Sequence, residues 1–289
     1  MKTKLAIGFS PCPNDTFIFC DLVNGKISDL PFNIEYVIAD VEQLNRMAQD
    51  KRLDVVKTSV ASYPNLSHEY AILTSGGALT WKDGPIVVSK QPLSMEEFRH
   101  TSIAIPGKGT TAAMLLDIFN LHEGPRHEML FSDIMPAVRD GFVNAGVVIH
   151  EGRWTYQSYG LVKILDLGEL WNKTFEVPLP LGIIAIKRTL LTKGYGQLIN
   201  EALRNSILYA RSHRSEVYHF IEKYASEMGK DIVDKHIDAF VNEFSEDLGI
   251  IGRRAVYRFV EEATKNKKIR KPTTLFWDET RIDNRHCEV

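Results

Sequence analysis

The chain has 289 residues, of which 44% are hydrophobic and 25% charged, a composition typical of a globular protein with one large or two ordinary domains. Lys and Arg together number 35 and Asp and Glu 37, so the formal charge is -2. A nearly neutral chain has no global field that would attract nucleic acid or an anionic membrane, so a small anionic ligand would have to be held by local groups.

Cysteine usage and hydropathy indicate a reducing, aqueous compartment. The three cysteines, Cys12, Cys20 and Cys287, cannot all pair, and no Cys or His cluster has zinc-ligand spacing. The apolar start of the chain ends at Phe9 with no cleavage site for a signal peptide, and no stretch approaches the ~20 apolar residues that span a bilayer. The basic stretch 265–271 is typical of a solvated segment. We therefore expect a cytoplasmic protein with no metal, no membrane contact and no nucleic-acid partner.

The first predicted element is a strand over residues 5–9, and a stiff turn follows it. In the segment SPCPNDT, residues 10–16, two prolines fix φ and remove two backbone donors, so the strand cannot continue. The Asn-Asp-Thr cluster that ends the segment is typical of a helix start, and apolar residues recur at helical spacing behind it. The sequence therefore predicts a strand, a rigid loop and a helix.

The rest of the chain shows two patterns of apolar residues. Up to about residue 190, apolar runs rich in Val and Ile alternate with helical patterns, which predicts βαβ units and parallel sheet, whereas only amphipathic helices follow from about residue 195. Turn formers over 76–89, and the stretch 176–190, mark places where the chain could leave one lobe and return. We expect an α/β fold with a first lobe of 1–84 plus 188–289 and a second lobe of 85–187, although two consecutive domains would give the same periodicity.

Polar residues cluster where the predicted strands end. Open parallel sheets bind ligands at the carboxyl ends of their strands, where helix N-termini present free N–H groups. Each cluster alone is at least as typical of a helix cap as of a ligand site. The clusters are Ser10 to Thr16, Lys57 to Ser59, Ser75 to Gly77, Gly107 to Thr111, and His150 with Glu151.

The loop GKGTT, residues 107–111, resembles a phosphate-binding Walker loop in composition only. Its lysine, Lys108, precedes Gly109, and no second glycine stands at the required distance upstream, so the spacing argues against an NTPase. The glycines and threonines still suit close approach of the backbone to an anion ahead of a helix.

One of nine histidines has the context of a catalytic base. His150 ends the apolar strand AGVVI and is followed by Glu151, which predicts an imidazole at the inner edge of a lobe that titrates near neutral pH. The others fall in helical or loop contexts among charged residues, and we interpret them as structural or solvated: His68, His100, His122, His127, His213, His219, His236 and His286.

Several of these segments together resemble one enzyme family, the 1,4-dihydroxy-6-naphthoate synthases of the futalosine route to menaquinone. The resemblance covers residues 4 to about 265 and is carried by SPCPNDTF, SGGAL, GTT, IHEGRWTY, YGLVKILDLG and PLPLG. It implies the two-lobed fold of type II periplasmic binding proteins, a substrate cleft between the lobes and no export signal. It also implies cleavage of cyclic dehypoxanthinyl futalosine to 1,4-dihydroxy-6-naphthoate without a redox cofactor.

The resemblance also assigns roles to residues. It implies that His150 accepts the proton and that the cleft contacts a small-molecule carboxylate substrate. The opening motif is expected to line the cleft or to hold the first loop rigid. The substrate-binding candidates are Lys57, Thr58, Ser59, Thr110, Thr111, Ser10, Asn14, Asp15 and Thr16.

Two alternative functions stay open at this level. A chorismate dehydratase-like enzyme of the same pathway would eliminate water from a different substrate, and a solute-binding protein of the same fold would use no base. The thiol of Cys12 could be nucleophilic at a helix start, although packing is favoured. The tail 276–289 lies outside the resemblance, and we expect it to be disordered or to pack on the first lobe. The sequence does not indicate an oligomeric state.

Overall fold

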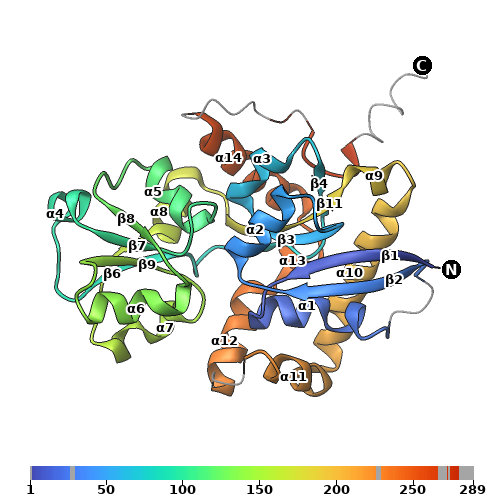
Figure 1. The fold of residues 1–289 in the computed structure, drawn as a ribbon, viewed down its shortest axis with the longest axis horizontal. Coiled ribbons are helices and arrows are strands. Elements are labelled where there is room, and N and C mark those ends of the chain that lie inside the picture. Colours follow the sequence, from blue (N-terminus) through green and yellow to red (C-terminus); the bar gives the residue numbers. More distant parts are fainter. Residues whose placement is uncertain (1, 27–29, 226–228, 266–271, 273, 280–289) are drawn as a thin grey trace.

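The structure is a computed structural model, and it describes residues 2–26, 30–225, 229–265, 272 and 274–279. These residues form two α/β lobes that lie side by side, with β6 to β9 in the lobe at the left of Figure 1 and β1 to β4 at the right. Most of the basic stretch 265–271, the last ten residues and Cys287 lie outside the described residues. No described helix is long and apolar enough to cross a membrane.

The first sheet has the strand order β2-β1-β3-β11-β4, with β5 also paired to β11. β1 runs parallel to β2 and β3, whereas β11 runs antiparallel to β3, β4 and β5. The strands span Thr3–Phe9 (β1), Phe32–Ile38 (β2), Val55–Ser59 (β3), Tyr70–Ile72 (β4), Ala78–Thr80 (β5) and Leu179–Lys187 (β11).

The second sheet has the order β10-β6-β9-β7-β8 and is also mixed. β7 is parallel to β8 and β9, but β6 is antiparallel to β9 and β10. Its strands are Ile86–Ser89 (β6), Ile103–Ile105 (β7), Arg126–Glu128 (β8), Ala145–Val148 (β9) and Val162–Asp166 (β10).

The parallel pairing expected from the sequence is present in both sheets, but each sheet also contains antiparallel pairs that the sequence analysis did not predict. The antiparallel pairs of both sheets include β6 or β11, the strands that follow the two crossings between the lobes. A strand that comes directly from the other lobe is not preceded by a crossover helix of its own sheet, so nothing obliges it to run with the βαβ strands.

Strand β11 also bears on where the lobes divide. The expected second lobe, 85–187, contains this strand, yet all of its pairing partners are in the first sheet. Nine residues long and buried through most of its length, it is the longest strand of that sheet. We propose that the chain leaves the first lobe at residues 84–85, as expected, and returns to it before Leu179.

Helices cover both sheets. The second lobe carries α4 to α8, at Met95–His100, Thr111–Ile118, Phe131–Arg139, Gly152–Thr155 and Leu167–Phe175, with η2 at Tyr156–Tyr159. Within the first 84 residues lie α1 to α3, at Pro13–Val23, Val41–Gln49 and Tyr63–Leu66, with η1 at Val60–Ser62. The C-terminal helices are α9 to α14, at Arg188–Leu191, Tyr195–Ser212, Arg214–Glu222, Lys230–Phe240, Glu243–Glu246 and Gly249–Lys265.

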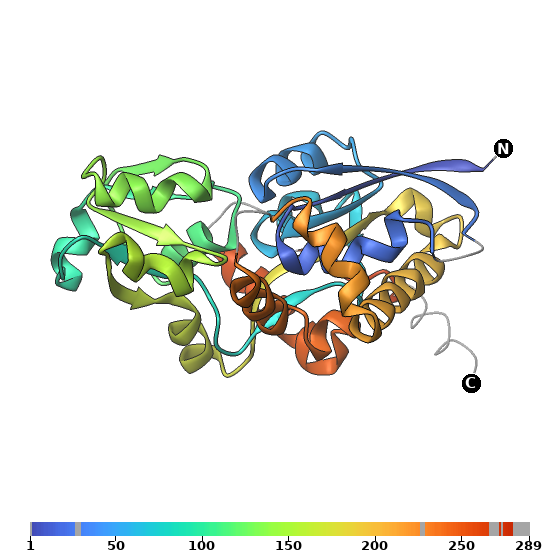
Figure 2. The ribbon, with the colours of Figure 1, turned by 90° about the horizontal axis from the view of Figure 1, so that it is seen from below.

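The C-terminal helices pack mainly on the elements of the first sheet and on α1. α10 lies along α1, where the hydroxyl of Ser206 donates to the carbonyl of Ile18 over 2.7 Å. α14 contacts both β11 and α5, so it lies where the lobes meet (Figure 2). One continuous apolar cluster accordingly includes Leu115 and Trp171 of the second lobe together with Phe259 of α14.

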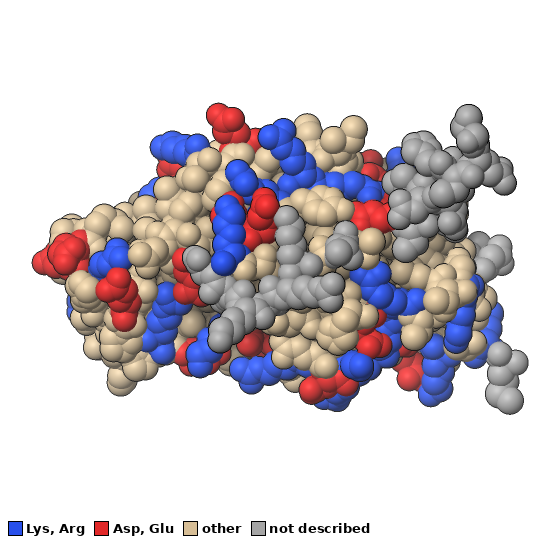
Figure 3. Space-filling model, turned by 90° about the horizontal axis from the view of Figure 1, so that it is seen from above, with Lys and Arg blue, Asp and Glu red and all other residues tan. Residues whose placement is uncertain are grey.

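The described part of the tail packs on the first lobe. Phe276 is buried and bridges Ile72 of β4, and the backbone N–H of Trp277 donates to the carbonyl of Ile72 over 3.0 Å. On the face of the molecule shown in Figure 3, basic and acidic side chains are interspersed instead of gathered in a patch of one sign. That distribution agrees with the near-zero formal charge.

Candidate active site

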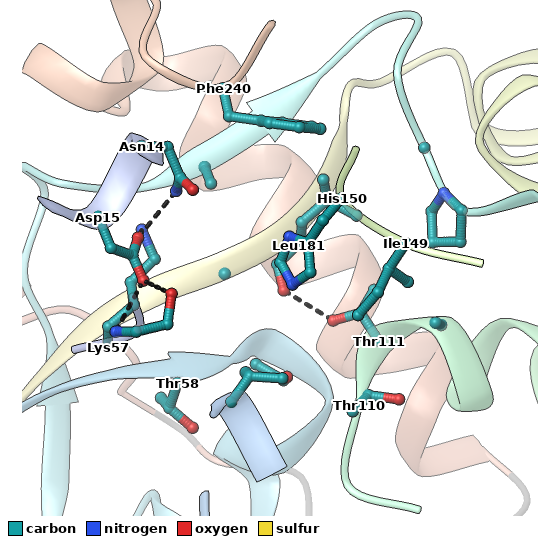
Figure 4. A pocket seen from close by; sticks show the side chains of 18 of the residues that line it. Asn14, Asp15, Lys57, Thr58, Thr110, Thr111, Ile149, His150, Leu181 and Phe240 are labelled. Atoms are coloured by element: carbon teal, nitrogen blue, oxygen red, sulfur yellow. Dashed lines mark hydrogen bonds and ion pairs between the residues drawn. The ribbon is translucent and has the colours of Figure 1, made fainter. Parts of the chain in front are cut away.

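A cavity lies between the two lobes and holds about 700 Å³ of empty space, part of it open to solvent. Figure 4 shows Asp15 and Lys57 on one side of it and Thr111 and His150 on the other. The cavity is lined by Ser10, Asn14, Asp15, Val41, Lys57, Thr58, Ser59, Ala78, Asp83, Gly84, Pro85, Thr110, Thr111, Ala112, Ile149, His150, Leu181, Gly182 and Phe240.

The opening loop is shaped by hydrogen bonds within the motif that follows β1. Helix α1 begins at Pro13, where a missing N–H costs nothing, and its N-cap is Cys12 with extended φ and ψ. The carboxylate of Asp15 turns back to accept from the N–H of Ser10 (3.2 Å) and from its hydroxyl (2.7 Å). The amide of Asn14 donates to the other oxygen of Asp15 over 2.8 Å. The loop is therefore rigid and keeps polar groups at the cavity wall.

Lys57 forms a buried ion pair with Asp15. Its ammonium nitrogen lies 3.0 Å from Oδ1 of Asp15, and only 6% and 4% of the two side chains are exposed. The same nitrogen donates to the carbonyl of Gly76 over 2.9 Å. An ammonium group has three donors, so these contacts leave one N–H for a ligand in the cavity.

The last two residues of β3, Thr58 and Ser59, are held by Asn45 of α2. Oδ1 of Asn45 accepts from the hydroxyl of Thr58 over 2.6 Å and from the backbone N–H of Ser59 over 3.0 Å. The Nδ2 group of Asn45 reaches the carbonyl of Gly109 in the second lobe at 3.4 Å. Asn45 therefore positions two cavity residues and connects them to the facing lobe.

The facing loop belongs to the start of α5. Thr110 is the N-cap, since its hydroxyl donates to the carbonyl of Gly107 (2.8 Å) and accepts from the N–H of Ala113 (3.3 Å). The hydroxyl of Thr111 donates to the carbonyl of Leu181 on β11 over 2.8 Å. This bond ties the helix start to the crossing strand, so both threonines are fixed at the cavity.

His150 follows β9 in a strained backbone conformation. Its φ is +55°, a left-handed value that is uncommon for a residue with a Cβ atom. The next turn begins at Gly152, where a Cβ atom would lie 2.3 Å from Cγ1 of Val148. The turn therefore requires glycine at 152, and it places the imidazole of His150 at the cavity wall.

Aromatic groups and one thiol surround the ring of His150. Phe131 meets it edge-on at 5.1 Å between ring centroids, and His236 of α12 stacks at 5.7 Å with an interplanar angle of 25°. The Sγ atom of Cys12 lies 3.6 Å from Nε2 and 3.7 Å from Nδ1. Burial lowers the pKa of His150, and Lys57 lowers it further, which together outweigh the opposing effects of Glu151 and Asp15. The imidazole is therefore neutral at pH 7 and can accept a proton.

The cavity brings together almost all of the residues predicted from the sequence. Ser10, Asn14, Asp15, Lys57, Thr58, Ser59, Thr110, Thr111 and His150 line it. Thr16 does not, because its hydroxyl donates to the carbonyls of Cys12 and Pro13 inside α1. The Ser75 to Gly77 segment is bound to α13 instead, with the hydroxyl of Ser75 donating to the carbonyl of Glu246.

Two features of the site escaped the sequence analysis. Phe240 lies at the end of α12 and closes one side of the cavity, but its apolar stripe resembled ordinary core (Figure 4). His236, interpreted from the sequence as structural or solvated, is not solvated, because its ring is fully buried against His150. Burial lowers the pKa of His236 well below its usual value. No signal in the local sequence separates these residues from their neighbours.

Cys12 contacts the imidazole of His150 through its Sγ atom. Its side chain is buried, and burial together with the nearby carboxylate of Asp15 raises the pKa of the thiol far above its usual value. The group is therefore a thiol at neutral pH and a poor nucleophile. Zinc-ligand spacing is absent from the sequence, yet one ligand atom each of Cys12, His150 and His236 lies within 4.8 Å of the others.

Comparison with known proteins identifies relatives over nearly the whole chain. Residues 5–265 match the family described as Menaquinone biosynthesis. A 1,4-dihydroxy-6-naphthoate synthase of Thermus thermophilus is 42% identical over 94% of this chain and 98% of its own length. A protein of the same name from Streptomyces coelicolor is 38% identical over 87% of this chain and 90% of its own.

Solved structures agree on the fold. Protein AF1704 from Archaeoglobus fulgidus superimposes with a TM-score of 0.84 at 33% identity, covering 90% of this chain and 96% of that one. The alkanesulfonate-binding protein SsuA from Xanthomonas axonopodis superimposes with a TM-score of 0.63 at 13% identity, covering 82% and 84%. The second likeness shows the fold alone, that of the two-lobed periplasmic binding proteins.

Proposed function

The chain belongs to the menaquinone biosynthesis family, and on that premise we propose that it is a 1,4-dihydroxy-6-naphthoate synthase acting on cyclic dehypoxanthinyl futalosine, with His150 as general base. The observation that carries the proposal is a neutral imidazole on the wall of an interlobe cavity, opposite polar groups suited to an anion. The 42% and 38% identity to synthases of that name supports the choice of reaction.

The proposed chemistry begins with removal of a proton from a substrate carbon by His150. The electron pair of the broken C–H bond drives cleavage of a C–C bond, and the new double bond completes an aromatic ring. The proton held by His150 then returns to the departing sugar-derived fragment. Positioned general bases contribute about 10²- to 10⁴-fold in rate, and aromatisation supplies the driving force.

The carboxylate of the substrate needs donors, because the chain has no excess positive charge. We place the carboxylate at the wall formed by the start of α1 and the end of β3. That wall carries the remaining N–H of Lys57, the hydroxyl of Ser59, which accepts from Asn45, and the positive end of the α1 dipole. The hydroxyls of Ser10 and Thr58 already donate to Asp15 and Asn45. Asp15 offsets the charge of Lys57, so a bound anion would be held mainly by hydrogen bonds.

The cavity also limits the access of water to the reacting carbon. It is lined on its other sides by Phe240, Leu181, Ile149 and Ala112. Contacts between the lobes, such as that of Thr111 with Leu181, narrow it, while one part stays open to solvent. Apolar walls strengthen the electrostatic interactions beside them and favour transfer of the proton to His150 over exchange with solvent.

The test is direct incubation of the purified full-length chain with cyclic dehypoxanthinyl futalosine, and separately with chorismate, followed by mass spectrometry of the products. We expect 1,4-dihydroxy-6-naphthoate from the first and no change in the second. The His150→Asn variant, prepared in the same way, controls for contaminating activity. Water loss from chorismate would assign the dehydratase reaction instead. Binding of either compound without turnover would indicate a solute-binding protein.

A further inference from the structure

We propose that Cys12, His150 and His236 form a binding site for one soft divalent cation, best matched by Zn²⁺, and that the bound cation holds the enzyme inactive. The three residues come from the start of α1, the end of β9 and α12, so the site exists only in the folded chain. The proposed reaction uses one of these three residues, and the family resemblance assigns no role to the other two, although Cys12 belongs to its opening motif.

The three side chains are near enough to share one cation after small side-chain rotations. At zinc-site bond lengths, a sulfur and a nitrogen ligand lie about 3.5 Å apart across a tetrahedral angle. Sγ of Cys12 lies 3.6 Å from Nε2 and 3.7 Å from Nδ1 of His150, and one ligand atom of His236 lies within 4.8 Å of both other ligands. Because Sγ is equally far from both nitrogens of His150, this ring has to turn to direct one nitrogen at the shared cation, and His236 has to move closer.

A second observation points to a ligand independently of the distances. Neither ring nitrogen of His236 has a hydrogen-bond partner among the described residues, although the side chain is 0% exposed. Burying a polar atom without a partner costs about 1–3 kcal/mol, so such an atom usually serves a bound group. Coordination of a cation by one nitrogen of His236 would remove that cost.

The types of donor select the cation. One thiolate and two imidazoles suit Zn²⁺ and its neighbours in softness, and they do not suit Mg²⁺ or Ca²⁺, which prefer oxygen. On binding, the S–H bond of Cys12 is replaced by a bond to the cation and one proton leaves to solvent, while both imidazoles bind as neutral ligands. The carboxylate of Glu151 is close enough to influence Cys12 and His150 and favours a positive ion there.

Inhibition follows from the shared histidine. A nitrogen of His150 that coordinates a cation has no lone pair left to accept a proton, so the cation and the base reaction exclude each other. This consequence rests on the function proposed above, whereas binding of the cation does not. Because His150 also lines the cavity, the fourth coordination position would face the cavity and would be open to water or to the substrate.

The test uses the untagged full-length protein, freed of metal by a chelator and titrated with Co²⁺, which absorbs visibly in tetrahedral sites. We expect one Co²⁺ per chain, with a thiolate-to-cobalt charge-transfer band that Zn²⁺ abolishes. Cys12→Ser should lose the band, and His236→Gln should weaken binding at least 10-fold. Cys20→Ser, at another buried free cysteine of the same helix, should bind as the wild type does.

Circular dichroism checks that each variant is folded, and His236→Gln decides the matter if Cys12→Ser does not fold. Absence of stoichiometric Co²⁺ binding to the wild type would overturn the proposal, and so would binding that survives both substitutions. A parallel assay of turnover should show inhibition by equimolar Zn²⁺ that a chelator reverses. An inactive protein that still binds Co²⁺ through Cys12 and His236 would contradict the proposed function and leave this site standing.

Discussion

Oδ1 of Asp15 lies 3.0 Å from the ammonium nitrogen of Lys57, and this ion pair joins the start of α1 to the end of β3 beneath the cavity. Both groups are nearly inaccessible to water. Two charges removed from water stabilise a fold only weakly as a pair, but loss of one partner leaves the other charge buried and uncompensated. The pair therefore fixes the cavity wall, and its two members depend on each other.

Asp15→Asn should destabilise the protein by about 3–5 kcal/mol, because the charge of Lys57 would stay buried without its partner. The double variant Asp15→Asn with Lys57→Met should be less destabilised than Asp15→Asn alone, since it removes both charges and keeps an acceptor for Ser10. Urea unfolding followed by circular dichroism measures the double variant and the two single variants, Asp15→Asn and Lys57→Met. A double variant that loses the sum of the two single effects would show that the residues do not act as a pair.

Thr110→Ala should destabilise the protein by about 1 kcal/mol, because the N–H of Ala113 loses the hydroxyl that caps α5. Thr110→Ser retains the hydroxyl and should be close to the wild type. Since Thr110 also lines the cavity, the alanine variant should show a higher KM as well. Equal stability of the alanine and serine variants in urea would contradict the capping role.

Gly152→Ala should destabilise the turn after His150 by about 1–3 kcal/mol and lower kcat, because the added Cβ atom would overlap Cγ1 of Val148. The second substitution Val148→Ala removes that methyl group and should restore most of the lost activity, while Val148→Ala alone is the control. Thermal melting and steady-state kinetics on the three variants test this. A Gly152→Ala variant with wild-type stability would show that the turn has room for a side chain.

The activity should persist below the ordinary histidine range of pH. Burial lowers the pKa of His150 in the folded protein, so the imidazole stays neutral, and active as a base, as the pH falls through about 6.5. The acidic limb of kcat/KM against pH should therefore have its midpoint below 6.5, measured in chelator and with the fold checked at each pH. A midpoint above 6.5 would mean that the protonated ring is stabilised and would contradict the burial effect.

Stability should change in the same direction. Burial lowers the pKa of both His150 and His236, so the unfolded chain binds protons that the folded chain does not. The free energy of unfolding should therefore be highest above about pH 6.5, where these histidines are neutral in both states, and should decrease as the pH falls below that value. Unfolding in urea at pH 7.5 and 5.5 should show the loss, and His236→Gln should show less of it than the wild type.

Much of this site could be predicted because its polar residues follow strands within single segments. The prolines at 11 and 13 mark the end of β1, and the threonines after Gly109 mark a helix start, so local chemistry was enough. The end of an apolar strand likewise indicated His150. Such features depend on adjacent residues in the chain, so they can be predicted from the sequence.

The rest depends on contacts between distant residues. His236 lies 86 positions after His150, and nothing in its amphipathic helix shows that its face meets the loop that carries His150. Asn45 of α2 holds Thr58 and Ser59 through its side chain. These contacts become apparent only when α2 is packed on β3. The antiparallel direction of β11 follows from the path between lobes, which periodicity does not encode.

The most direct test of the central claim is the turnover of cyclic dehypoxanthinyl futalosine by His150→Asn, because asparagine tolerates the left-handed backbone at this position but is not basic. Under saturating substrate and in chelator, we predict a kcat at least about 10²-fold below that of the wild type, with an unchanged melting temperature. A folded His150→Asn enzyme that turns over within a few-fold of the wild type would contradict the account.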